Sequence, residues 1–115
     1  MISPIAMGKI SRDGKIIKAT PGIKVKNIKP IDINSQERYG YLISLPDRLV
    51  KDSDYIVQLT AENFGENGPD FTVTSIALRY QTKKNFEVII WGDRVQSGLK
   101  METVKSNWHF VIYDI

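Results

Sequence analysis

Apolar and polar residues alternate with a period of two along most of the chain, and turn-forming residues bound the alternating runs. In Ile23-Lys24-Val25-Lys26 the alternation is strict, and it places apolar side chains on one face only. A second run, beginning at Tyr39, repeats the pattern with Tyr41, Ile43 and Leu45 on the same face. Helical spacing is nearly absent. The pattern therefore predicts β-strands, each with one buried face.

Two hairpins are predicted from the turns between such runs. Residues 9–10 and 15–17 flank Ser11-Arg12-Asp13-Gly14, where Asp-Gly can supply the positive φ angles of a tight turn. Residues 71–76 and 86–91 alternate on either side of a turn at Lys83-Lys84-Asn85. Both pairs of segments are expected to lie antiparallel.

The other segments are less regular. Residues 55–60 predict a further strand, and residues 29–37 carry Pro, Asp, Asn and Ser and predict a loop. Residues 94–105 lack a clean period. They are expected to cross from one sheet to the other, or to form a loop with a short turn of helix.

The last predicted strand is apolar on both faces. One face carries Trp108, Phe110 and Ile112, and the opposite face carries His109, Val111 and Tyr113. Such a strand either lies in the middle of a sandwich or presents its second face to another subunit. His109, Val111 and Tyr113 are therefore a candidate subunit interface.

Seven or eight short strands within 115 residues indicate an all-β fold, because a parallel fold would need amphipathic helices between its strands. We expect an antiparallel β-sandwich, jelly-roll-like, as a single domain over residues 9–115. Residues 1–8 are a candidate N-terminal anchor, with Ile2, Pro4 and Ile5 as its apolar contacts. No signal peptide and no membrane span are expected.

Composition narrows the function classes. The chain has no cysteine, which excludes disulfides, thiolate metal sites and a Cys nucleophile. His109 is the sole histidine and has no Ser or Asp at a spacing that suggests a nucleophile triad. The carboxylate pairs Asp52/Asp54 and Glu62/Glu66 match no calcium-loop spacing. We therefore expect no enzyme, no cofactor and no metal.

The charge of the chain is uneven along its length. Residues 1–30 hold seven Lys and Arg against one Asp, whereas residues 31–115 hold nine against twelve acidic residues. A basic segment can contact nucleic acid or an acidic partner. Lysine at alternate positions also protects edge strands against aggregation, and this second interpretation is favoured.

The aromatic residues divide into two groups. Phe71, Phe86, Trp108 and Phe110 fall on the most apolar strand faces and are expected in the core. Phe64, Tyr80 and Trp91 fall at strand ends or in loops, where a ring can stack on a sugar or a base, or cover a sheet edge. These three are the candidate contacts to a ligand or receptor.

The order of segments resembles the C-terminal β-domains of bacteriophage fibres. The resemblance is carried by Gly8-Lys9-Ile10-Ser11-Arg12-Asp13-Gly14-Lys15-Ile16, by Tyr55-Ile56-Val57-Gln58-Leu59-Thr60 and by Trp108-His109-Phe110-Val111-Ile112-Tyr113, with the segments at 41–45, 71–73 and 85–88 between them. It covers most of residues 8–115. The departures are residues 29–37 and 94–105.

The resemblance implies a homotrimeric virion structural protein: a head fibre, a tail-fibre knob or a capsid decoration protein. Its partners would be copies of itself, a capsid or tail protein bound through the N-terminus, and a glycan or protein of the bacterial surface. It would be made in the host cytoplasm and reside in the phage particle.

Two other classes remain open. A carbohydrate-binding module would use Phe64, Tyr80 or Trp91 as stacking rings. A small nucleic-acid-binding β-barrel would use the basic N-terminal third, but residues 23–29 contain no aromatic ring, so this class ranks last.

Overall fold

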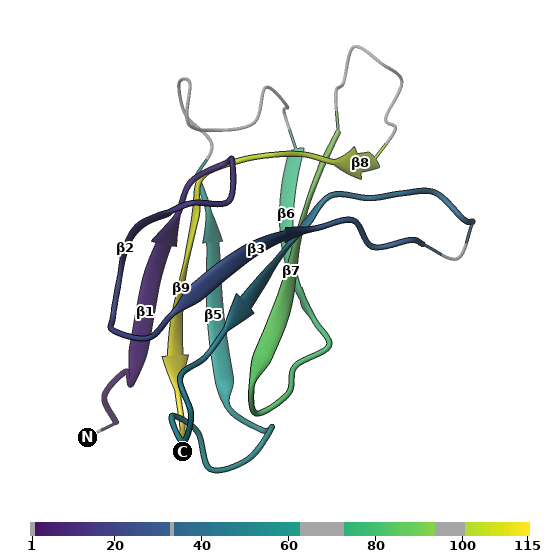
Figure 1. Ribbon diagram of the computed structural model, residues 1–115. Coiled ribbons are helices and arrows are strands. Elements are labelled where there is room, and N and C mark those ends of the chain that lie inside the picture. The colour runs from purple at the N-terminus through teal and green to yellow at the C-terminus, as the bar shows by residue number, and fades with distance from the viewer. Residues whose placement is uncertain (1, 33, 63–72, 94–100) are drawn as a thin grey trace.

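The chain folds as two antiparallel β-sheets packed face to face (Figure 1). The computed structural model describes residues 2–32, 34–62, 73–93 and 101–115, which contain nine strands and no helix. The prediction of an all-β sandwich is confirmed. The structure has nine strands rather than seven or eight, because one strand of three residues gave no periodic signal.

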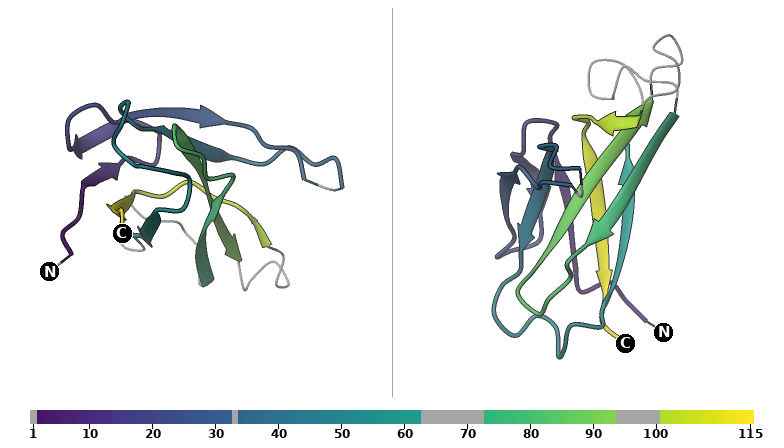
Figure 2. Two further views of the ribbon diagram at one scale, coloured as in Figure 1. Left: turned by 90° about the horizontal axis from the view of Figure 1, so that it is seen from below. Right: turned by 90° about the vertical axis from the view of Figure 1, so that its right-hand side faces the viewer.

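Each sheet is built from strands that are distant in sequence. Sheet A has the order β2 (Ile16–Ala19), β1 (Ala6–Ile10), β9 (Trp108–Tyr113) and β5 (Ile56–Ala61). Sheet B has the order β3 (Lys24–Ile28), β4 (Gly40–Ser44), β7 (Asn85–Asp93) and β6 (Val73–Arg79), and β8 (Met101–Thr103) also pairs with β7. The two views in Figure 2 show the two layers.

Both predicted hairpins are present. β1 pairs with β2 around the Asp-Gly turn, where Gly14 has a φ of 81°. The Asn27 side chain of β3 donates a hydrogen bond of 3.0 Å to the carbonyl oxygen of Asp13, which ties this turn to sheet B. β6 pairs with β7 along its whole length, and so forms the second hairpin.

The segment at residues 94–105 does cross between the sheets where it is described. Residues 101–103 form β8 in sheet B, not a turn of helix, and Val104 N–H donates to Ile90 O at 2.9 Å. The chain then enters β9 of sheet A. Ser106, fully buried, donates its hydroxyl to Glu62 O at 2.5 Å, which joins the crossing to the end of β5.

The core is a cluster of aromatic rings between the two sheets. Trp108, Phe110, Phe86 and Tyr41 are all at most 1% exposed. The ring centroid of Trp108 lies 5.4 Å from that of Tyr41 and 5.9 Å from that of Phe110, and Phe86 meets Phe110 edge-on at 5.5 Å. The predicted core positions are thus confirmed for three rings. Phe71 lies outside the described residues.

A glycine in β1 makes room for one of these rings. A Cβ atom on Gly8 would lie 2.7 Å from the Phe110 ring, which is closer than the two groups can approach. We expect Gly8→Ala to lower the free energy of unfolding by about 1–3 kcal/mol, because Phe110 cannot move without disturbing the core. Urea unfolding measures this. The double variant Gly8→Ala/Phe110→Leu should lose less free energy of unfolding than the two single variants lose together, because the smaller Leu side chain leaves room for the new methyl group. Strictly additive losses would contradict this explanation.

The N-terminal boundary differs from the prediction. β1 begins at Ala6, which is buried, so the domain starts before residue 9. Ile5 also packs against the core, and its N–H donates to Ile112 O at 2.9 Å. Ile5 therefore packs as part of the sandwich. Ile2 and Pro4 are exposed, and the N-terminus lies at the same end of the sandwich as the C-terminus (Figure 1).

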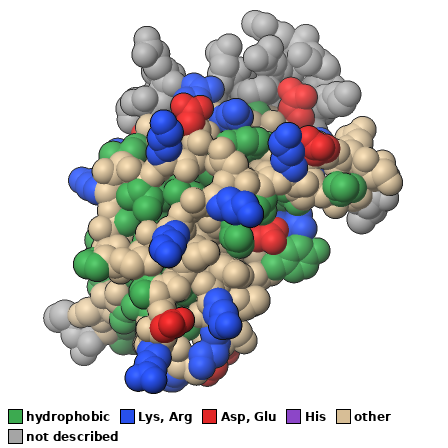
Figure 3. Space-filling model, in the orientation of Figure 1, with side chains coloured by type: hydrophobic (Ala, Val, Ile, Leu, Met, Phe, Trp, Pro, Cys, Tyr) green, Lys and Arg blue, Asp and Glu red, His purple; other side chains and the backbone are tan. Residues whose placement is uncertain are grey.

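The basic segment lies along the two edge strands. β2 is one edge of sheet A and β3 is one edge of sheet B, and each carries or adjoins exposed lysines. These are Lys15, Lys18, Lys24, Lys26 and Lys29. In Figure 3 the Lys and Arg side chains are dispersed among apolar and neutral ones over the visible face. This distribution fits edge protection.

Candidate functional site

The outer face of sheet A brings the candidate interface residues together. His109, Val111 and Tyr113 all point away from the core on the central strand β9, and each is half-buried. The register places Met7 of β1 opposite Val111, and Ile56 of β5 opposite Tyr113. We call Met7, Ile56, Val111 and Tyr113 the apolar face.

The apolar face is open to solvent although it is rich in large side chains. Met7 is 44% exposed and Ile56 is 47% exposed. Ile16 and Ile17 of the neighbouring edge strand β2 are also exposed, but Ile16 pairs with the core residue Ile10 and so lies on the inner side of the sheet. A shallow hollow of about 470 Å³ opens at the apolar face; its lining runs from Met7, Lys9 and Lys18 across to His109 and Val111. Exposed apolar patches of this kind mark contact surfaces.

One ion pair borders the apolar face. Lys9 Nζ lies 2.8 Å from Glu62 Oε1, and because Lys9 is on β1 and Glu62 follows β5, the pair spans β9 beside His109. Glu62 is only 8% exposed, and its Oε2 atom has no hydrogen-bond partner among the described residues. The carboxylate therefore depends on Lys9 for its charge compensation.

Residues 29–32 and 34–39 belong to an arm between β3 and β4, where the sequence predicted a loop over residues 29–37. The arm crosses the outer side of sheet B and projects beyond it (Figures 1 and 2). Ile31 and Glu37 face each other in an antiparallel bridge, and Arg38 N–H donates to Pro30 O at 2.7 Å. At the base, Tyr39 N–H donates to the Thr103 hydroxyl of β8 at 3.0 Å.

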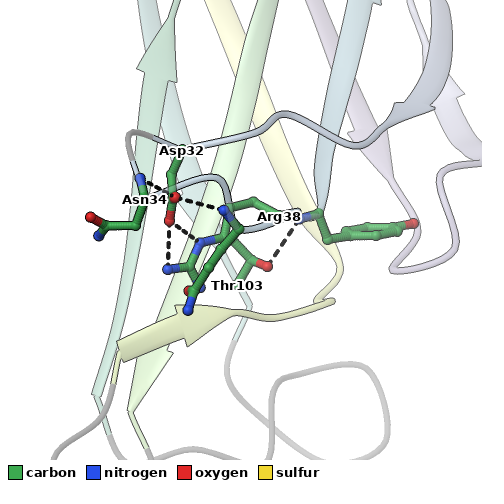
Figure 4. A network of polar contacts seen from close by, with 6 residues as sticks. Asp32, Asn34, Arg38 and Thr103 are labelled. Carbon is green, nitrogen blue, oxygen red and sulfur yellow. Dashed lines mark hydrogen bonds and ion pairs between the residues drawn. The ribbon is translucent and has the colours of Figure 1, made fainter.

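Asp32 organises the tip of this arm (Figure 4). Its Oδ1 atom accepts hydrogen bonds from the N–H groups of Asn34 and Gln36, at 2.8 and 3.0 Å. Its Oδ2 atom accepts two from the Arg38 guanidinium, both at 2.8 Å. The Gln36 amide, then the Arg38 side chain, hold the pKa of Asp32 below its ordinary value. All four bonds join Asp32 to residues two to six positions later in the arm, so together they fix the conformation of its tip.

Arg38 links the arm to a candidate ligand contact. Its guanidinium carbon lies 5.0 Å from the centre of the Trp91 ring, at cation–π distance. The sequence predicted Trp91 at a strand end or in a loop, which is wrong: β7 continues through Gly92 to Asp93, so Trp91 is inside the strand. Trp91 therefore holds the arm against sheet B, and one face of its ring is already occupied.

Tyr80 is exposed, as the sequence predicted for a strand end. It follows β6 directly and is 68% exposed. It does not lie beside Trp91, because Trp91 pairs with Ser75 near the opposite end of β6. The third candidate, Phe64, lies outside the described residues.

The pKa shift of Asp32 gives a testable pH dependence. Since its pKa is lowered in the folded chain, the ionised carboxylate stabilises the arm, fully above about pH 4, and this contribution is lost as the pH falls through the folded pKa. An NMR titration of the Asn34 and Gln36 amide signals should give a midpoint below that of an ordinary aspartate. Asp32→Asn should abolish the transition and leave the melting temperature nearly unchanged. A midpoint at or above the ordinary value would contradict this role.

Groups that bind metals or cross membranes are not found in the described part of the chain. No three His, Cys, Asp or Glu side chains there come together as metal ligands. Within the same residues, no helix has the length and apolar character needed to cross a bilayer.

Comparison with known proteins gives no family assignment. No protein-family model matches the chain, and searches of curated proteins and of solved structures find no significant match.

Proposed function

We propose that this chain is a structural module that assembles with copies of itself through the outer face of sheet A. The observation that carries the proposal is the apolar face: Met7 and Ile56 stand half exposed beside Val111 and Tyr113 on the two central strands and one edge strand of the sheet. A polar outer face would be the expected pattern for a sheet that works alone.

A second copy of the chain is the occupant that best fits the face. Lys9 on this side of the sheet is paired with Glu62, and the neighbouring outward residues Gln58, Thr60 and Thr20 are neutral, which leaves Lys18, opposite Lys9, as an exposed cation at the edge of the face. An apolar centre with a largely neutral, polar rim is the composition of a self-association surface.

The proposed setting is a bacteriophage particle, as a head fibre, a tail-fibre knob or a capsid decoration protein. This part of the proposal is supported by the segment pattern that resembles fibre domains, together with the sandwich fold. In that setting a trimer is the expected assembly. Ile2 and Pro4, exposed at one end of the sandwich, would contact the capsid or tail.

Charge substitutions on the two sheets test the surface. Met7→Glu and Ile56→Glu each place a carboxylate on the apolar face, where the half-exposed position lets the monomer keep its fold. We expect each to weaken self-association at least about tenfold, because an unpaired charge at an interface is costly to desolvate. Sedimentation velocity measures the assembly, and a thermal melt checks the fold.

Ala77→Glu is the matched control, because Ala77 is exposed on β6 of sheet B. It should associate like the wild type. If Met7→Glu and Ile56→Glu assemble as tightly as the wild type, or if only Ala77→Glu dissociates, the outer face of sheet A is not the contact surface.

A further inference from the structure

A second surface lies between the arm and the end of β6. There a hollow of about 420 Å³ is lined by Ile31, Asp32 and Asn34 of the arm and by Arg79 and Tyr80. Its volume is in the range of small-molecule sites, about 300–1,000 Å³. It contains one aromatic ring, one aliphatic side chain and a few polar groups. This hollow is on sheet B, so it is separate from the apolar face.

Tyr80 combines an exposed ring with an unusual backbone conformation. Tyr80 has a φ of 50°, in the left-handed region that residues other than Gly, Asn and Asp rarely adopt. The Arg79 guanidinium carbon lies 4.4 Å from the centre of the ring and so covers one of its faces. With 68% of the residue exposed, an aromatic surface is left available beside the hollow. Strained backbone geometry of this kind is concentrated at binding sites.

The charges around the hollow cancel. Arg79 Nε lies 3.2 Å from Glu87 Oε1, and the Asp32 carboxylate is compensated by Arg38 at 2.8 Å. Among the described residues that line the hollow, a phosphate or a carboxylate would therefore find no uncompensated cation. The hollow at Arg48, Lys83 and Lys84, by contrast, gathers three cations. The hollow at Tyr80 suits a neutral ligand.

The polar group that faces outward is an amide. Figure 4 shows the Asn34 side chain pointing away from the Asp32–Arg38 network, and Asn34 is exposed. A carboxamide offers both a donor and an acceptor, as vicinal hydroxyl groups require. Asp32 has its oxygens engaged by the arm itself, so it is a positioning residue that fixes the backbone of Asn34.

We propose that this hollow binds a neutral saccharide unit. The apolar face of a pyranose ring stacks on Tyr80 and against Ile31, which is 68% exposed, and its hydroxyl groups bond to the Asn34 amide. The arm, held down through Arg38 on Trp91, forms the wall opposite Tyr80. The site does not depend on self-association, and either proposal can fail while the other stands.

The test is a binding titration of the full chain, followed by NMR. The probes are neutral oligosaccharides, namely maltotriose, cellotriose, mannotriose, chitotriose and lactose, with a sulfated disaccharide as the anionic comparison. We expect saturable binding of at least one neutral sugar, with shifts at Asn34 and Tyr80, and weaker binding of the sulfated sugar. Absence of binding by all neutral probes, or preference for the sulfated one, overturns the proposal.

Three variants locate the contact. Tyr80→Asn removes the ring and still tolerates a positive φ, so the turn is preserved. It should weaken binding at least about tenfold, in line with the contribution of a stacking ring. Tyr80→Phe keeps the ring and should bind the sugar within about threefold of the wild-type affinity. The affinity of Asn34→Ala should lie between those of Tyr80→Asn and Tyr80→Phe, because one hydrogen-bonding group is lost but the ring remains. Wild-type affinity in Tyr80→Asn, with its fold intact, overturns the assignment of the site.

Discussion

Replacing Trp108 with Ala should lower the free energy of unfolding by about 3–5 kcal/mol. Trp108 is fully buried on β9, which pairs with both β1 and β5, and its ring contacts Tyr41 and Phe110. The substitution leaves a cavity at the point where both sheets meet, and rigid aromatic neighbours cannot close it. Since a domain of this size is typically stable by about 5–15 kcal/mol, the variant should be marginally folded. Urea unfolding followed by circular dichroism measures the change.

The second tryptophan provides the control. Trp91→Ala removes the same side chain from a half-exposed position on the outer face of sheet B, so its cost should be clearly smaller. Its main effect should be to loosen the attachment of the arm to sheet B, because Arg38 loses its contact with the Trp91 ring. If Trp91→Ala proved as destabilising as Trp108→Ala, the core would not lie where the structure places it.

Replacing Lys9 with Met should lower the free energy of unfolding by about 2–3 kcal/mol, although Lys9 is itself partly exposed. The loss arises at Glu62, whose side chain is only 8% exposed and would lose its partner cation. Removing one member of a buried ion pair destabilises a protein by more than the intact pair stabilises it, because the remaining charged group stays away from water without a partner. The partial exposure of Lys9 places the expected value below that of a fully buried pair. Thermal and urea unfolding measure the effect.

A double-mutant cycle separates this effect from a general loss of packing. Glu62→Gln removes the charge, so Lys9→Met should be much less harmful in the Glu62→Gln background than in the wild type. Equal costs in the two backgrounds would show that Glu62 does not depend on Lys9.

Most of the fold could be predicted from local patterns. The period of two located the strands, and the Asp-Gly turn located the first hairpin, because both depend on neighbouring residues only. The face carrying Trp108, Phe110 and Ile112 was predicted from the same alternation and is buried in the structure. The three-residue strand β8 gave no signal, since it is too short to show a period.

The arm and its contacts could not be predicted in this way. The contact of Arg38 with Trp91 and the bond from Tyr39 to Thr103 join residues far apart in sequence, and no periodic pattern reports such pairs. The alternation predicted a strand that ends at residue 91, whereas β7 continues to Asp93, because two further residues without alternation still pair with β6 and β8. A local signal did exist at Asp32, whose side chain bonds to the amides two and four residues later, as turn-forming aspartates do.

The candidate interface was predicted from one strand, and the structure enlarges it. Alternation in β9 identified His109, Val111 and Tyr113, but their neighbours Met7 and Ile56 come from strands at other places in the chain. Only the order of strands in sheet A brings these side chains together. Sequence patterns define the face of each strand, whereas the composition of a whole surface depends on strand order.

The most direct test of the central proposal is the solution mass of the wild-type chain, measured by light scattering after size exclusion over a series of dilutions. Self-association through sheet A predicts a mass that is a whole multiple of one chain, three in the proposed fibre setting, and that falls toward the single-chain mass only on dilution. A single-chain mass at every concentration, from a folded sample, would contradict the proposal.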